Sequence, residues 1–168
     1  SLGCNGYVDK DKAVLLVKTH GKNTKSSHRI DFAYDNACVG TNPNISNDIV
    51  GDLLKNYKLP QFTNYDINTI KREKTVLNSR FDVYFEDNDD NKYYIEVKTA
   101  PVKDHNNNCA VFPKGYRKKK DESYSPRAIK HLEELAHLSK TDDKNKCFLI
   151  FIVPRNDVDY FTPLNIYN

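Results

Sequence analysis

The segment that most restricts the fold is residues 80–100, RFDVYFEDNDDNKYYIEVKTA, which carries two strand patterns joined by a polar turn. Aromatic and β-branched side chains recur on both sides of EDNDDN (86–91), as is typical of a β-hairpin. Because side chains alternate across a strand, Glu96 and Lys98 are expected on the same face of the second strand. A carboxylate and an ammonium group side by side on a half-buried strand require an explanation.

The first strand of this hairpin supplies a second acid, Asp82. Its apolar neighbours Phe81, Val83 and Phe85 are expected on the opposite face. Asp82 can then face Glu96 across the antiparallel pair, where two carboxylates raise each other's pKa unless a cation lies between them. Hard divalent cations prefer oxygen ligands. The hairpin is open to two interpretations: a divalent-metal site, or a cross-strand ion pair on a solvated face, which contributes about 0.2–1 kcal/mol.

Helix and strand patterns alternate through the rest of the chain. Apolar residues recur at helical spacing between a capping Ser46 or Asn47 and Pro60, and a second helix follows Ser125. The apolar run CFLIFIV (147–153) is typical of a strand covered on both faces. The predicted elements are strands 13–18 and 30–35, helix 41–57, strands 69–78, 80–85 and 92–100, a polar loop at 103–124, helix 125–138 and strand 147–153.

This order predicts an α/β fold in two parts. Residues 1–40 form a small β segment, and residues 41–168 form a main body with the order αβββαβ. The 168 residues are enough to bury one proper core. The chain contains no methionine, so we expect a fragment or a trimmed chain.

Charge and cysteine content restrict the partners and the compartment. The formal net charge of +3 is too small to indicate a nucleic-acid partner by itself, and the run RKKK (117–120) is either a solvated loop or a local contact surface. The four cysteines show no metal-binding spacing, which favours free thiols in a reducing compartment. No apolar run reaches the roughly 18 residues of a membrane span. We therefore expect an intracellular, soluble protein of the cytoplasm, nucleoid or nucleus.

A series of separated motifs resembles the sugar fermentation stimulation protein A family, within the PD-(D/E)xK nuclease superfamily. In order they are REKTVLNSRFDVYF, YYIEVKTAPV, VFP, SPRAIKHLEELAHL, CFLIFIV and RNDVDYFTP, and the likeness runs along most of residues 39–163. The resemblance implies a restriction-endonuclease-like core, a mixed sheet flanked by helices. It also implies a preceding OB-like DNA-binding segment, which is truncated here because residues 1–40 are too few for a five-stranded barrel.

The resemblance assigns roles to the hairpin. Asp82 and Glu96 would hold a divalent metal, Mg²⁺ or Mn²⁺, and the carbonyl of Val97 would add a ligand. Lys98 would assist the attacking water and stabilise the charge that develops on a phosphate. These are the residues expected to carry catalysis.

Three further residues are candidates on helices. Asp52 lies where family members carry an acid in the first core helix, although an aspartate is one methylene shorter than a glutamate. Lys130 falls on the KHL motif, where the superfamily often places a Gln or Lys toward the site. Each is equally well read as an exposed helix residue. His131 beside it is more simply a structural or solvent-facing histidine than a catalytic base.

Basic residues near these motifs are candidates for nucleic-acid contacts. Arg80 precedes the Asp82 motif and Arg127 lies in the first turn of the second predicted helix; either can instead be an ordinary surface residue. The chain also departs from the family where Lys114 replaces an acid after FP and a basic stretch follows. The remaining candidates in that stretch are Arg117, Lys118, Lys119 and Lys120.

The function expected from these residues and the resemblance is a DNA-binding, divalent-metal-dependent nuclease that hydrolyses phosphodiester bonds. Two alternatives remain open. One is a non-cleaving DNA-binding or regulatory protein of the same family, and the other is an interaction module whose site is vestigial.

Overall fold

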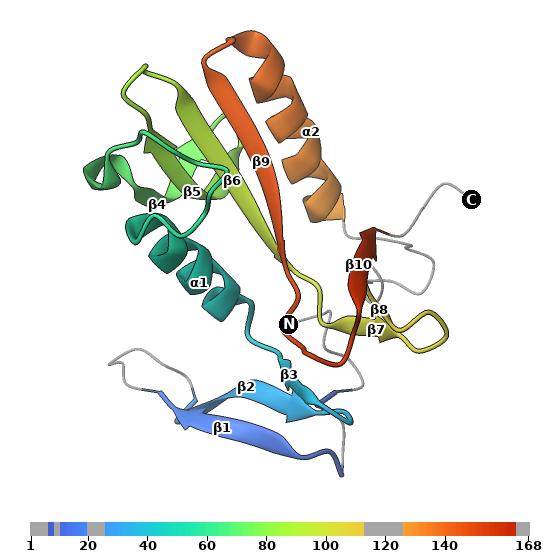
Figure 1. Ribbon diagram of the computed structural model, residues 1–168. Helices are drawn as coiled ribbons and strands as arrows, with labels where there is room; N and C mark the ends of the chain where they lie inside the picture. Colours follow the sequence, from blue (N-terminus) through green and yellow to red (C-terminus); the bar gives the residue numbers. More distant parts are fainter. Residues whose placement is uncertain (1–6, 9–10, 20–25, 113–125, 164–168) are drawn as a thin grey trace. The chain divides into compact units, whose positions relative to one another are not determined.

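The computed structural model describes residues 7–8, 11–19, 26–112 and 126–163 (Figure 1). Two compact units are present. The core unit consists of Asn44–Lys98 and Pro126–Ile152, and the accessory unit contains the described parts of residues 1–43, 99–125 and 153–168. This division differs from the predicted boundary after residue 40, because segments from later in the chain join the N-terminal part.

The core unit contains both predicted helices and a four-stranded sheet. Its elements are α1 (Pro43–Lys55), the 3₁₀-helix η2 (Ile67–Thr69), β4 (Lys71–Val76), β5 (Ser79–Glu86), β6 (Lys92–Thr99), α2 (Pro126–Thr141) and β9 (Asn145–Ile152). The strand order is β4-β5-β6-β9, with β4-β5 and β5-β6 antiparallel. The predicted order αβββαβ is therefore present. Within the described residues, no helix is long and apolar enough to cross a bilayer.

Two apolar clusters fix the helices against the sheet. Residues of α1, among them Val50 and Leu54, pack with Val83, Ile95 and other side chains of β5 and β6. Residues of α2 pack against the other face of the hairpin in a second cluster: Phe81, Tyr84, Tyr94, Leu135 and Leu138. Burying each such side chain contributes about 1.5–3 kcal/mol. The hairpin is therefore held from both sides.

The predicted facing of β5 is wrong at one residue. Phe81 packs on the α2 side, whereas Val83 packs on the α1 side, although strict alternation would place them together. The β4–β5 ladder pairs Arg72 with Val83 and Lys74 with Phe81, and the residues between these pairs, Glu73 and Asp82, are absent from it. Glu73 has a φ of 56°, in the left-handed region. This local distortion changes the face of β5 at Asp82.

The accessory unit contains two small sheets. Its strands are β1 (Val14–Lys18), β2 (His28–Tyr34), β3 (Cys38–Gly40), β7 (Val102–Asp104), β8 (Cys109–Phe112) and β10 (Tyr160–Pro163). The order β1-β2-β3 is antiparallel, and the second sheet, β10-β8-β7, pairs β10 with β8 in parallel. The prediction of a loop from residue 103 is corrected by the hairpin β7–β8, whose turn includes Asn108 with a φ of 51°.

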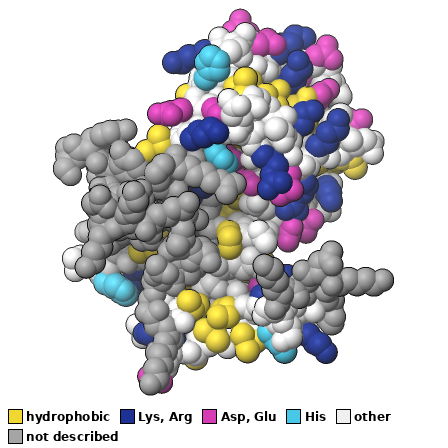
Figure 2. All heavy atoms as spheres, turned by 180° about the vertical axis from the view of Figure 1, so that it is seen from behind, with side chains coloured by type: hydrophobic (Ala, Val, Ile, Leu, Met, Phe, Trp, Pro, Cys, Tyr) yellow, Lys and Arg dark blue, Asp and Glu magenta, His cyan; other side chains and the backbone are white. Residues whose placement is uncertain are grey.

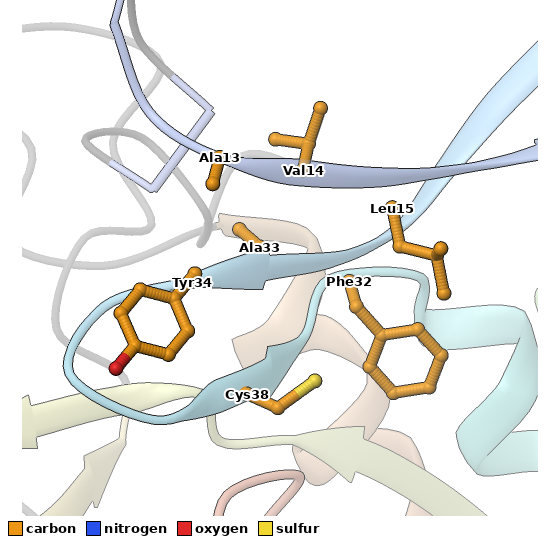
Figure 3. A pocket seen from close by; sticks show the side chains of 7 residues that line it. All are labelled: Ala13, Val14, Leu15, Phe32, Ala33, Tyr34 and Cys38. Atoms are coloured by element: carbon orange, nitrogen blue, oxygen red, sulfur yellow. The ribbon is translucent and has the colours of Figure 1, made fainter.

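The first of these sheets exposes apolar side chains. Leu15, Leu16 and Tyr34 are each more than half exposed, and apolar surface gathers in the lower part of the rear view (Figure 2). A shallow apolar pocket lies over the same sheet, with Leu15, Phe32 and Tyr34 among the residues that line it (Figure 3). The OB-like character predicted for residues 1–40 stays a prediction.

A buried guanidinium joins four segments of the accessory unit. Arg155 donates from Nε and Nη2 to the two carboxylate oxygens of Asp157, at 2.7 and 2.8 Å. Its Nη1 donates to the carbonyl of Pro101 at 3.0 Å and to the hydroxyl of Tyr7 at 3.1 Å. Asp35 lies 3.5 Å from Nη2. These hydrogen bonds, with a further contact from Lys103, hold the pKa of the Asp157 carboxyl well below its ordinary value of 3.8.

The lowered pKa of Asp157 predicts a loss of stability in acid. Because the folded pKa lies below the unfolded one, the contribution is present above the ordinary pKa of 3.8 and is lost as the pH falls below it. Denaturant unfolding between about pH 6 and pH 2 should therefore show a smaller fall in the free energy of unfolding for Asp157→Asn than for the unmodified protein. Asp143→Asn, at an exposed position, is the control. If the free energy of unfolding falls equally with pH in all three proteins, the prediction is contradicted.

The left-handed backbone of Glu73 predicts that glycine is more stabilising than alanine at this position, the reverse of the usual order within a strand. At this position Glu73→Gly should be more stable than Glu73→Ala by about 1 kcal/mol, because only alanine retains the Cβ that strains this φ. Both variants remove the exposed ion pair with Arg80, so it cancels in the comparison. At Thr75 on the same strand the order should reverse by roughly 0.5–1 kcal/mol. Urea denaturation of the four variants measures both differences, and the same order at both positions would refute the inversion.

Candidate metal centre

The candidate site lies where the ladder between β5 and β6 ends. The last paired residues are Val83 and Ile95, and continuing the register by one residue places Asp82 opposite Glu96. Instead of another backbone pair, the N–H of Val97 donates to Oδ2 of Asp82 at 2.8 Å. The carboxylate therefore takes the position of a backbone acceptor at the end of the hairpin.

Asp82 is held by donors on both of its oxygens. Asn47, on α1, donates from Nδ2 to Oδ1 at 2.8 Å, and Val97 donates to Oδ2. Burial, the larger cause, and the charge of Glu96 both raise the pKa of Asp82 above its ordinary value. The two hydrogen bonds and the charge of Lys98 oppose this shift. A nearby cation would offset both causes of the shift.

Glu96 is almost completely buried and its two oxygens differ. Oε1 is contacted by the ammonium of Lys98 and by Nδ1 of His131, the latter at 2.7 Å. Oε2 is buried and has no hydrogen-bond partner among the described residues. A buried carboxylate oxygen without a donor is costly, so this atom is the natural place for a cation.

The donor chemistry fits a hard divalent cation. Asp82 and Glu96 offer carboxylate oxygens, and Val97, whose carbonyl is the third predicted ligand, directly follows Glu96 in the chain. Within the described residues, no three His, Cys, Asp or Glu side chains gather into a metal-binding group. Two carboxylates suit Mg²⁺, which keeps several waters and commonly uses one or two carboxylates together with substrate phosphate oxygens.

The predicted lysines occupy different positions. Lys98 lies beside Glu96, with 18% of its side chain exposed, so it is available to a ligand at the site. Lys130 is exposed; its Nζ donates to the carbonyl of Asn78 at 3.2 Å and lies 3.7 Å from Oε1 of Glu134. None of these contacts joins Lys130 to the two carboxylates.

The structure does not bring Asp52 to the pair. Asp52 is exposed on α1 and lines a surface pocket with Ile49 and Leu53. It follows Asn47, which contacts Asp82, by five residues, and this spacing places the two side chains about 140° apart around the helix. Helical geometry therefore directs Asn47, and not Asp52, to the site.

The predicted nucleic-acid contacts are only partly described. Arg80 is exposed, and its Nη2 lies 3.5 Å from Oε1 of Glu73. Basic and acidic side chains are interspersed over the upper part of the rear view (Figure 2). The other predicted contacts lie outside the described residues: Arg117, Lys118, Lys119, Lys120 and the side chain of Arg127.

Sequence reasoning missed the roles of two polar residues. Asn47 was expected as a helix cap, but it lies inside α1 and contacts Asp82. Asparagine is unfavourable inside helices, which is the signal that could have identified it. His131 was set aside as structural or solvent-facing, but it is 7% exposed and contacts Glu96.

The sheet, the helices on its two faces and the carboxylate pair define an α/β protein with a restriction-endonuclease-like core. The family model described as "Sugar fermentation stimulation protein RE domain" matches residues 44–167. The chain belongs to this family, as its motifs predicted.

Curated relatives and a solved structure agree with this assignment. A sugar fermentation stimulation protein homolog of Clostridium kluyveri is 30% identical over 161 residues, 95% of this chain and 64% of the relative. One of Ruminiclostridium cellulolyticum is 36% identical over 97 residues, 58% of this chain and 37% of the relative. The chain thus spans 64% of the length of the first of these. The structure of Pyrococcus furiosus SfsA in complex with Ca²⁺ has a similar fold, with a TM-score of 0.71 at 21% identity over 88% of this chain and 57% of that chain.

Two facing carboxylates predict that the metal-free protein is stabilised by removing one of them. Asp82→Asn should raise the unfolding temperature in EDTA by about 2–4 °C, corresponding to roughly 1 kcal/mol. The new amide can accept from Val97 and donate to Oδ1 of Asn47, while the repulsion with Glu96 disappears. Thermal unfolding followed by circular dichroism measures the shift. Asp52→Asn, on the same helix as Asn47, should leave the temperature unchanged; a decrease for Asp82→Asn would contradict the repulsion.

Proposed function

We propose that this protein is a divalent-metal-dependent phosphodiesterase that acts on DNA. The observation that carries the proposal is that Glu96, which the strand register places opposite Asp82, has one oxygen in contact with Lys98 and the other, Oε2, buried without a partner among the described residues. Membership of a family with a restriction-endonuclease-like domain supports phosphodiester hydrolysis over other metal-dependent reactions.

Asp82, Glu96 and the carbonyl of Val97 would hold Mg²⁺ or Mn²⁺. When bound, such a metal supplies Lewis-acid stabilisation of a phosphoryl oxygen and lowers the pKa of a coordinated water. The ammonium of Lys98 is near enough to the pair to donate to a phosphate oxygen or to orient the attacking water. Val97 and Asn47 keep the Asp82 carboxylate in place through the hydrogen bonds that they donate. The relative from Pyrococcus furiosus was solved in complex with Ca²⁺, which supports a divalent cation here.

A non-cleaving DNA-binding or regulatory protein is the second candidate. It is favoured by the placement of Asp52 and Lys130. The resemblance predicts an additional acidic and an additional basic side chain at the site, but the contacts of these two residues do not join them to Asp82 and Glu96. Phosphate contacts by Arg80 and the basic run would serve this function equally well.

A cleavage assay tests the proposal. The protein is incubated with single-stranded, duplex and branched DNA in Mg²⁺, Mn²⁺ or EDTA, and products are resolved on denaturing gels. Cutting should require a metal and fall at least about 100-fold in Asp82→Asn and Lys98→Ala. Lys146→Ala, an exposed lysine on β9, is the matched control.

The two candidate functions give different results in this assay. DNA binding without cutting in either metal would reject the phosphodiesterase and favour the regulatory protein. Cutting that survives both Asp82→Asn and Lys98→Ala would show that another site or a contaminating enzyme is responsible.

A further inference from the structure

His131 is a polar residue on an apolar face of α2. It lies four and seven residues before Leu135 and Leu138, and these spacings place all three on one side of the helix. Leu135 and Leu138 pack in the cluster with Phe81, and His131 is buried to a similar degree, with 7% of its surface exposed. A leucine at this position would continue the apolar face. Packing alone therefore does not explain the histidine.

The buried imidazole makes a directed contact with one oxygen of Glu96. Nδ1 of His131 lies 2.7 Å from Oε1, which the ammonium of Lys98 also contacts. A carboxylate oxygen can only accept, so Nδ1 is the donor. Two donors from different elements, α2 and β6, thus converge on the same oxygen.

This convergence makes the two oxygens of Glu96 unequal. Rotation of the carboxylate out of its present plane would break both of these contacts, so they fix the orientation of the carboxylate plane. Oε2 is then left buried and without a partner among the described residues. Burying a charged pair in this way is usually no more stabilising than an apolar side chain of similar size. The arrangement is explained if Oε2 is kept available for a ligand.

We propose that His131 is a positioning residue, which fixes Glu96 so that Oε2 is presented to the divalent cation. The inference rests on the proposed metal site, and it assigns the orientation of the ligating Glu96 carboxylate to α2. Groups that orient metal ligands typically change metal affinity by about 10–100-fold when they are removed. His131 touches neither substrate nor metal in this role and acts only through Glu96.

Two polar substitutions distinguish positioning from packing. The amide nitrogen of asparagine occupies nearly the place of Nδ1, whereas that of glutamine lies nearer the place of Nε2. His131→Asn should therefore bind Mn²⁺ with a dissociation constant within about threefold of the unmodified protein, and His131→Gln should bind about 10–100-fold more weakly. Isothermal titration calorimetry with Mn²⁺ measures the affinities, and thermal unfolding in EDTA measures stability.

Leu135→Ala on the same face is the control for destabilisation. It should lower the unfolding temperature in EDTA but leave the Mn²⁺ dissociation constant within about threefold of the unmodified protein. If His131→Gln does not fold, the comparison of His131→Asn with His131→Ala replaces it, with the same tenfold or greater difference expected.

The outcomes separate this inference from the proposed function. The role of His131 would be overturned, and the metal site left intact, if Asp82→Asn loses Mn²⁺ binding while His131→Gln binds Mn²⁺ as tightly as the unmodified protein. His131→Ala replaces His131→Gln in this comparison if the latter does not fold. No binding of Mn²⁺ by the unmodified protein would overturn both. A Mn²⁺ affinity that falls equally in His131→Asn, His131→Gln and Leu135→Ala would show a role in packing only.

Discussion

The hydrogen bond from Val97 to the Asp82 side chain determines how the site is built. It closes the hairpin with a carboxylate where a backbone carbonyl would otherwise accept, so the end of the ladder and the site are the same place. Because Glu96 directly precedes Val97, the same bond fixes the strand that carries the second carboxylate. The backbone distortion at Glu73 lies opposite Asp82 on the neighbouring strand. It changes the face of β5 at Asp82, the residue whose side chain accepts the hydrogen bond from Val97.

The two helices have matching roles on opposite faces of the hairpin. Each is held by an apolar cluster, and each places one polar donor on one carboxylate: Asn47 on Asp82, and His131 on Glu96. The positions of these donors follow from core packing, because Asn47 lies one turn from Val50 and His131 one turn from Leu135. Correct packing of the apolar clusters and correct geometry of the carboxylates are therefore coupled.

The hairpin, the carboxylate pair and the order of elements could be predicted because they depend on local alternation and turn composition. The face on which Phe81 packs could not be predicted, because it depends on a left-handed φ at Glu73. Glutamate rarely adopts such a φ, so the sequence gives no sign of it. Asp52 was selected by its place in a motif, but contact with the site depends on which face of α1 the apolar residues bury. The hairpin β7–β8 was missed because a polar turn hides two short strands.

The metal-free site opposes stability in two ways that one ion would correct. Asp82 faces Glu96 and has a raised pKa, and Oε2 of Glu96 is buried without a donor. A cation that binds only the folded chain stabilises the folded state. Once the cation concentration exceeds the dissociation constant, this stabilisation grows with the logarithm of the concentration. The apolar clusters must therefore supply the stability of the metal-free protein. The carboxylate pair, kept by these clusters in an otherwise unfavourable arrangement, is more simply explained by ligand binding than by a contribution to folding.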